Sequence, residues 1–172
     1  MIELVKQSLL SQYEAALSML RQRIDACPEE YWDAMVGQGT FRQDAYHVLF
    51  WMDYYLSPGE ERFSMLEHHV EGGDEREPVI SRGLDKMATL LFLANCHKKL
   101  LKIIESETET SLSAGSGFPS IFVKRPLNRI ELHLYNIRHL QHHTGQLSLV
   151  LSRLAQEEGL DLPLPWIGAD WR

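Results

Sequence analysis

Eight histidines occur in this chain, and the spacing of two of them predicts a shared metal ion. His139 and His143 stand four residues apart in the run HLQHH. In a helix, residues at this spacing lie about 40° apart around the axis and about 6 Å apart along it. Two imidazoles placed in this way can converge on one divalent cation, with metal–nitrogen bonds of about 2.0–2.1 Å.

His142 is a competing ligand, because it follows His139 by three residues and that spacing also brings side chains to one helix face. Spacing alone does not choose between His142 and His143. Metalloproteases use the four-residue spacing in HExxH, where the glutamate is a general base. Leu140 stands at that position here, so a protease of this type is excluded. Helices also carry such histidine pairs by chance, which leaves a purely structural role open.

A third ligand has to come from another segment, and His47 in the run FRQDAYHVLFWMDYYL is the candidate. Asp44, Trp51 and Tyr54 share its helical face at offsets of three, four and seven residues. A carboxylate can orient a ligating imidazole, and aromatic side chains can narrow a pocket. The competing interpretation is a hydrogen-bonded core histidine within an ordinary aromatic stripe.

The other histidines fit this site less well. His133 precedes His139 by six residues and faces another direction. His97 adjoins Lys98 and Lys99, which is typical of a solvated helix face. Residues 68–69 fall in a connection that predicts no fixed geometry.

Four segments have the three- and four-residue apolar spacing of amphipathic helices. They cover about residues 3–25, 40–56, 83–105 and 128–157. Pro28, Ser57-Pro58-Gly59 and Gly159 are typical stop signals after three of these segments. The connections 58–82 and 106–127 are polar and read as loops, and no alternating run is long enough for a core strand. The pattern predicts an all-α bundle with a crossover connection.

Composition favours a single domain over residues 1–172, because 44% hydrophobic and 24% charged residues are ordinary for a globular protein of this length. A net charge of -7 argues against binding to nucleic acid. Apolar runs fall short of the roughly 18 residues of a membrane span, and no signal peptide is predicted. Cys27 and Cys96 are far apart, so we expect no disulfide framework and a cytoplasmic location. The tail 159–172, with Trp166 and Trp171, is expected to pack on the bundle or on a partner subunit.

Two motifs resemble those of the DinB/YfiT-like superfamily. Residues 138–151, RHLQHHTGQLSLVL, resemble its last-helix motif of a histidine, three residues, a second histidine, one residue and then Gly-Gln. The matching positions are His139, His143, Gly145 and Gln146. The run around His47, AYHVLFWMDYYL, is similar to the second-helix motif of the same family. His142 and Thr144 depart from it, since an aromatic residue and an arginine are frequent there.

The resemblance implies an up-down-down-up four-helix bundle with its long connection between the second and third helices. It also implies a divalent ion, among zinc, nickel, manganese and iron, held by His47, His139 and His143, and so favours His143 over His142. Gln146 could then hydrogen-bond a ligating imidazole or a substrate, although a packing role is equally compatible with its position. Many relatives are homodimers, and we expect the same here.

Relatives of known activity resemble thiol-dependent transferases and isomerases. The leading hypothesis is therefore a metal-dependent transferase or hydrolase that acts on a small molecule. The metal would activate a thiol or a water molecule as the nucleophile. Two alternatives remain. One is a non-catalytic, stress-related metal-binding module, and the other is a structural bundle that dimerises and whose histidines serve packing.

Overall fold

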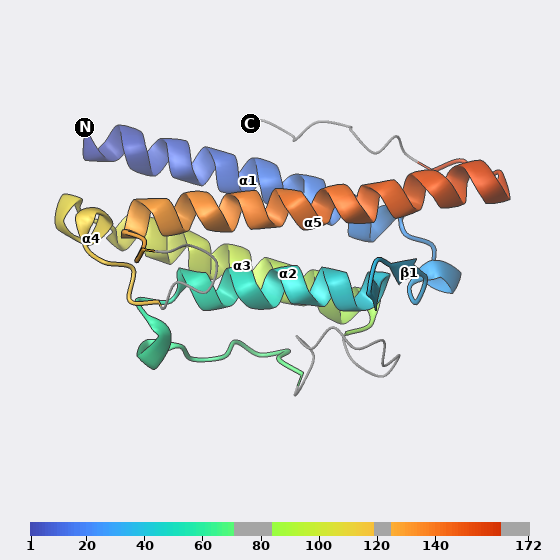
Figure 1. Cartoon of the computed structure of the whole chain (residues 1–172), viewed down its shortest axis with the longest axis horizontal. Coiled ribbons are helices and arrows are strands. Elements are labelled where there is room, and N and C mark those ends of the chain that lie inside the picture. The colour runs from blue at the N-terminus through green and yellow to red at the C-terminus, as the bar shows by residue number, and fades with distance from the viewer. Residues whose placement is uncertain (71–83, 119–124, 163–172) are drawn as a thin grey trace.

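The computed structural model describes residues 1–70, 84–118 and 125–162, and these ranges are mostly helical (Figure 1). The long helices are α1 (Ile2–Ala26), α2 (Phe41–Leu56), α3 (Lys86–Ser106) and α5 (Arg129–Glu158). The shorter elements are η1 (Glu29–Tyr31), β1 (Met35–Val36), β2 (Gly39–Thr40), η2 (Glu60–Arg62) and α4 (Glu109–Ser113). The four predicted helices are thus present, and the all-α fold class is confirmed.

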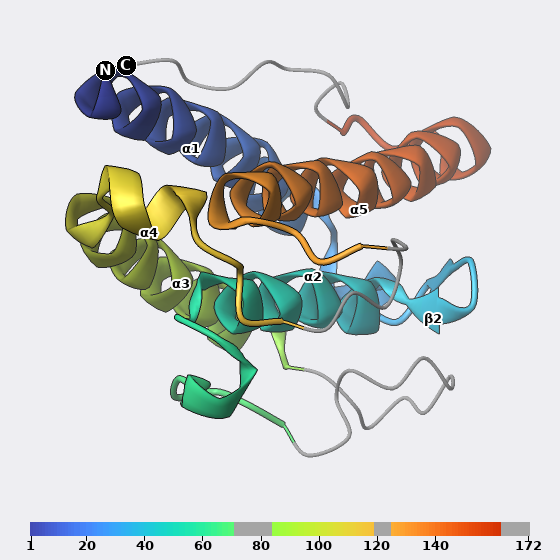
Figure 2. The same ribbon diagram turned by 60° about the vertical axis from the view of Figure 1, so that its left-hand side comes forward.

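The long helices pack as two pairs, α1 beside α5 and α2 beside α3 (Figures 1 and 2). The pairs also contact each other, through α1 with α3 and through α2 with α5. Each helix therefore has two neighbours and turns one apolar side toward a common core. Fully buried side chains from all four helices fill that core, among them Tyr13, Leu20, Tyr46, Phe92 and Leu147. The contact between α2 and α5 is the one that matters for the histidines.

The start of α2 is held by a capping box. The Thr40 hydroxyl accepts from the backbone N–H of Gln43, and the Gln43 side chain accepts from the backbone N–H of Thr40. A two-residue antiparallel ladder between β1 and β2 precedes this cap, and Gly37 supplies a left-handed φ of 61° in its turn. This cap fixes where α2 begins, and so places His47 about two turns into the helix.

Helix α5 also has caps at both ends. Asn128 and Glu131 form a capping box at its start, and Gly159 ends it in the left-handed conformation, as the sequence predicted. The 30-residue length of α5 places His139 and His143 well inside the helix, where both flanking turns hold the backbone rigid.

Arg129 joins the start of α5 to the end of α2. Its guanidinium donates to the backbone carbonyls of Tyr55, Leu56 and Ser57, at 3.1, 2.9 and 2.7 Å. The last carbonyls of a helix have no partner within it, so these bonds act as a C-terminal cap supplied by another helix. The same guanidinium donates to Glu107 at 2.9 Å, and both side chains are almost completely buried.

Glu107 is itself held in its charged form. Burial by itself raises the pKa of this carboxyl, but hydrogen bonds from His133, Ser111 and Arg129 outweigh burial and lower the pKa to about 2. The carboxylate is therefore ionised at any ordinary pH and completes the buried ion pair.

Two polar regions differ from the sequence prediction. The sequence predicts a loop for residues 106–127, but α4 forms within it, where Thr108 and Ser111 make a capping box. The sequence predicts that Lys99 lies on a solvated helix face and that residues 68–69 have no fixed geometry. Instead, Lys99 pairs with the fully buried Asp53, and His69 Nε2 lies 2.9 Å from the same carboxylate. A buried charge needs partners, and these two side chains supply them.

The C-terminal tail was expected to pack on the bundle or on a partner, but Trp166 and Trp171 lie outside the described residues. No described helix has both the length and the apolar character that crossing a bilayer requires.

Candidate metal centre

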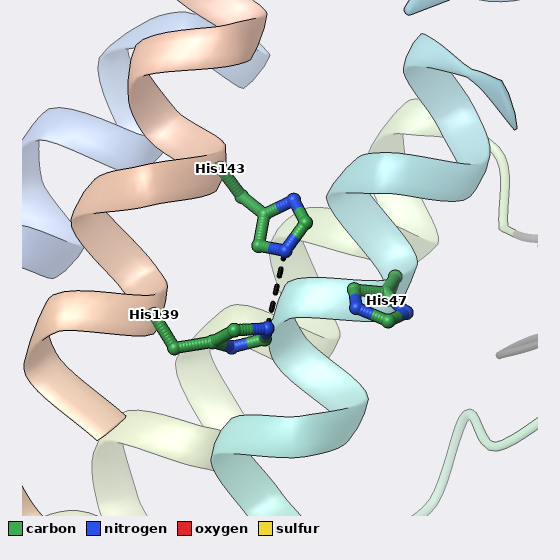
Figure 3. A group of neighbouring side chains, drawn as sticks. All are labelled: His47, His139 and His143. Atoms are coloured by element: carbon green, nitrogen blue, oxygen red, sulfur yellow. Dashed lines mark hydrogen bonds between the residues drawn. The ribbon is translucent and has the colours of Figure 1, made fainter. Parts of the chain in front are cut away.

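The structure brings His47 from α2 together with His139 and His143 from α5 (Figure 3). One ring nitrogen of each imidazole lies within 4.8 Å of the corresponding nitrogens of the other two. The Nε2 atoms of His139 and His143 are 3.1 Å apart. The ring centre of His47 is 4.8 Å from that of His143 and 5.5 Å from that of His139. The three predicted residues thus form one cluster across the α2–α5 contact.

Burial separates the two competing histidines of α5. His143 is only 1% exposed, whereas His142 is an exposed residue. The reason is helical geometry, since adjacent residues lie about 100° apart around the axis and cannot both face α2. His143 is the one that faces the cluster.

Asp44 reaches across from α2 to α5. Its Oδ1 lies 2.8 Å from Nδ1 of His143, and its side chain is 11% exposed. A carboxylate only accepts hydrogen bonds, so Nδ1 of His143 is the donor and carries the proton. With the proton on Nδ1, the Nε2 of a neutral His143 carries its lone pair toward the cluster, where it lies 3.1 Å from Nε2 of His139. A carboxylate that orients a histidine in this way is the usual companion of a metal-binding imidazole.

The aromatic residues predicted around His47 divide into two groups. The Trp51 ring packs edge-on against His47, with 6.1 Å between ring centres. Tyr54 turns away, since its hydroxyl donates to Glu60 at 2.7 Å and its ring packs against Phe63 and Trp51. Gln146 is half-buried on α5, one turn beyond His143. Asp44 therefore contacts His143 and Trp51 contacts His47, whereas Tyr54 packs against Trp51 and reaches none of the three histidines through the contacts described.

Sequence reasoning missed Tyr135. Its ring lies nearly parallel to the His139 imidazole, with an interplanar angle of 11° and 6.2 Å between ring centres. The signal was present, because Tyr135 precedes His139 by four residues and so shares its helix face. An aromatic residue at this spacing in a long amphipathic helix is also common in cores, so the pattern alone did not single it out.

Three other histidines have partners of their own. His69 lies against Asp53, and His133 lies between Tyr13 and Glu107. His97 is 3.5 Å from Glu14 on the bundle surface. The pKa of His133 is lowered, and burial is the largest cause of this shift. His133 is therefore neutral near pH 7, and its ring nitrogens donate or accept hydrogen bonds within the buried network.

The separation between His139 and His143 is close to that of two ligands of one divalent cation. Two ligand nitrogens in tetrahedral coordination, at bonds of about 2.0–2.1 Å, are separated by roughly 3.3 Å. The observed 3.1 Å between His139 Nε2 and His143 Nε2 is close to that separation. Neutral imidazole suits zinc, nickel and iron alike, so the donor set fits a metal without naming it.

Comparison with protein families agrees with the motifs. The model of the DinB superfamily matches residues 12–147, which include all three histidines and most of the four long helices. The chain belongs to the DinB superfamily. Comparison with curated proteins and with solved structures gave no match. Membership rests on the family model, and it agrees with the resemblance seen in the two histidine motifs.

Asp44→Asn tests the carboxylate beside this DinB histidine cluster. The amide keeps the size of the side chain but removes its charge, so it holds the proton on His143 Nδ1 less firmly. Changing such partners typically weakens metal affinity by about 10–100-fold. We expect a loss in this range, measured by competition with a chromophoric zinc chelator. Asp33→Asn is a matched control, because Asp33 pairs with Arg42 rather than with a histidine. An equal loss in both variants would contradict the role of Asp44.

Proposed function

We propose that this chain is a metal-dependent enzyme that transfers or hydrolyses a group on a small molecule. Its metal would be zinc, nickel, manganese or iron, held by His47, His139 and His143. Membership of the DinB superfamily and the three-histidine cluster support this proposal. A low-molecular-weight thiol is proposed to occupy a further coordination position of the metal, as in the relatives that the motifs resemble.

One observation carries the proposal. The cluster consists of three histidines, and within the described ranges no cysteine, aspartate or glutamate joins them as a fourth ligand. Structural zinc sites are closed by four protein ligands, whereas catalytic sites keep a position open for water or substrate. A three-histidine cluster supported by Asp44 therefore favours catalysis over a purely structural ion.

The side chains around the cluster would hold the metal and shape its surroundings. A bound divalent cation lowers the pKa of a water or thiol and so supplies a nucleophile near neutral pH. His47, His139 and His143 would bind as neutral imidazoles, and Asp44 would keep the proton of His143 on Nδ1. The Trp51 and Tyr135 rings would keep water from the side of the site where they pack.

The arrangement of the bundle and its assembly belong to the same proposal. We propose the up-down-down-up order of this superfamily, which the course of the helices in Figure 1 supports, since α2 and α3 run against α1 and α5. Homodimer formation also stays a proposal, and sedimentation of the purified chain would test it.

Turnover by metal-loaded protein tests the function. Zinc-, nickel- and manganese-loaded samples would be incubated with a low-molecular-weight thiol and electrophilic acceptors, and with activated esters in the absence of thiol. Free thiol and ester absorbance would be followed over time. We expect the loaded protein to consume thiol or ester faster than free metal does, with at least one combination of metal and substrate. This activity should be lost in His139→Ala. His97→Ala is the control, because His97 lies on the opposite side of the bundle, against α1.

Metal-loaded wild type that consumes neither thiol nor ester would contradict the enzymatic proposal. Metal binding without turnover would instead favour the non-catalytic metal-binding module.

A further inference from the structure

We infer that Trp51 and Tyr135 form a recognition wall for a substrate with a flat apolar body, which ligates the metal through an anionic oxygen or sulfur at one end. This inference rests on the proposed function, because the wall adjoins the histidine cluster. It adds a substrate class and two specificity residues to the site.

The Trp51 and Tyr135 rings lie next to the histidines on α2 and α5. Trp51 follows His47 by one turn of α2, and Tyr135 precedes His139 by one turn of α5. Each ring packs on the imidazole of its own helix, with centres 6.1 and 6.2 Å apart. Because both rings lie toward the end of α2 and the start of α5, they flank the cluster on the same side.

Tyr55 packs against both the Trp51 ring and the Tyr135 ring. Tyr55 is 8% exposed and lies between them, stacked on Trp51 at 5.5 Å and edge-on to Tyr135 at 5.4 Å. Burial raises the pKa of Tyr55 above its ordinary value, and its hydrogen bond with Tyr135 adds to this effect. The Tyr55 hydroxyl therefore stays protonated, and the bond between the two tyrosines holds both rings in place. Tyr55 forms a small hydrophobic cluster with Phe118 and Leu132, and Trp51 and Tyr135 pack against that cluster.

Trp51 and Tyr135 are more exposed to solvent than Tyr55. Trp51 and Tyr135, which pack on the histidines, are half-buried, whereas Tyr55, which packs against both, is buried. Partly exposed aromatic surface next to convergent polar groups is the usual composition of a small-molecule site. A flat apolar group placed on these rings would gain burial as well as the preferred offset or edge contacts between ring systems.

The charged side chains differ between the two sides of the histidine cluster. Asp44 precedes His47 by about one turn, so an anionic group meets a carboxylate on that side. On the opposite side, the guanidinium carbon of Arg138 lies 5.2 Å from the centre of the Tyr135 ring. Arg138 is exposed, and it makes no ion pair within the described ranges. The anionic ligand and its body are therefore directed away from Asp44 and along the aromatic wall.

Two hydroxamates that differ only in their body test the wall. Cobalt(II)-loaded protein would be titrated with acetohydroxamate and with benzohydroxamate, and binding followed through the visible absorption of the cobalt. Wild type should bind benzohydroxamate about tenfold more tightly. The preference should fall to about twofold or less in Trp51→Ala and in Tyr135→Ala. Tyr135→Phe, which keeps the ring, should retain most of it, and Tyr31→Ala is the matched control away from the site.

The outcomes separate the inference from the proposed function. Equal affinity of wild type for the two hydroxamates would overturn the wall while leaving the metal centre intact. A preference that survives both Trp51→Ala and Tyr135→Ala would also overturn it. Failure of wild type to bind cobalt would overturn the metal centre, and the inference with it.

Discussion

Replacing His143 by alanine should abolish tight binding of a divalent metal, whereas replacing its neighbour His142 should leave binding unchanged. His143 is buried, lies 3.1 Å from His139 through their Nε2 atoms and is oriented by Asp44. Changing a group that merely hydrogen-bonds to a ligand costs about 10–100-fold in affinity, so removal of the ligand itself should cost more than about 100-fold.

Metal content after purification without an affinity tag is the direct measurement. We expect about one equivalent in wild type and in His142→Ala, and almost none in His143→Ala, after loading with zinc, nickel or manganese and dialysis. The two variants differ by one position on the same helix and lose the same imidazole, so a general effect of removing a histidine cancels. Circular dichroism of His143→Ala would show whether the helices persist. Retained metal in His143→Ala, or loss in both variants, would contradict the assignment of this ligand.

Arg129→Met should be strongly destabilising, although Arg129 lies outside the metal centre. It removes the donor of four hydrogen bonds and leaves the buried Glu107 carboxylate without its cation. Breaking a buried ion pair on one side costs about 3–5 kcal/mol, because the remaining charge keeps its desolvation penalty. The carbonyls at the end of α2 lose their partner as well, and each such loss adds to the cost.

Urea unfolding of the metal-free protein, followed by far-UV circular dichroism, would measure this change in free energy. The control is Arg125→Met, because Arg125 pairs with Glu131 on the surface, four residues away from Arg129 in the chain. Solvent screens that exposed pair, so its loss should have little effect on stability. Similar midpoints for wild type and Arg129→Met would show that the buried network contributes nothing to folding.

Much of this fold follows from local pattern. The apolar spacing of three and four residues located all four long helices to within a few residues, and Gly159 marked the end of the last one. The four-residue interval between His139 and His143 placed both imidazoles on one face. These features depend on the chain within one or two turns, which is the range over which a helix sets its own geometry.

Contacts between helices were not available from the same pattern. That Asp44 binds His143 rather than a residue of its own helix depends on how α2 and α5 are rotated against each other. The same holds for Asp53, whose partners Lys99 and His69 come from α3 and from the connection after α2. Side chains that seemed solvated along the chain became the necessary partners of a buried charge.

The sequence by itself therefore determined the helices, the faces on which the histidines lie and, through the resemblance, the family. Spacing left His142 and His143 open, and the resemblance favoured His143. The tertiary structure decided that His47 meets the α5 pair, that His143 is buried against it while His142 is exposed, and that Tyr135 adjoins it. The physical reason is that helix periodicity fixes the relative directions of side chains on one helix. Which of those directions points at a partner is set by the packing of separate helices around a shared core.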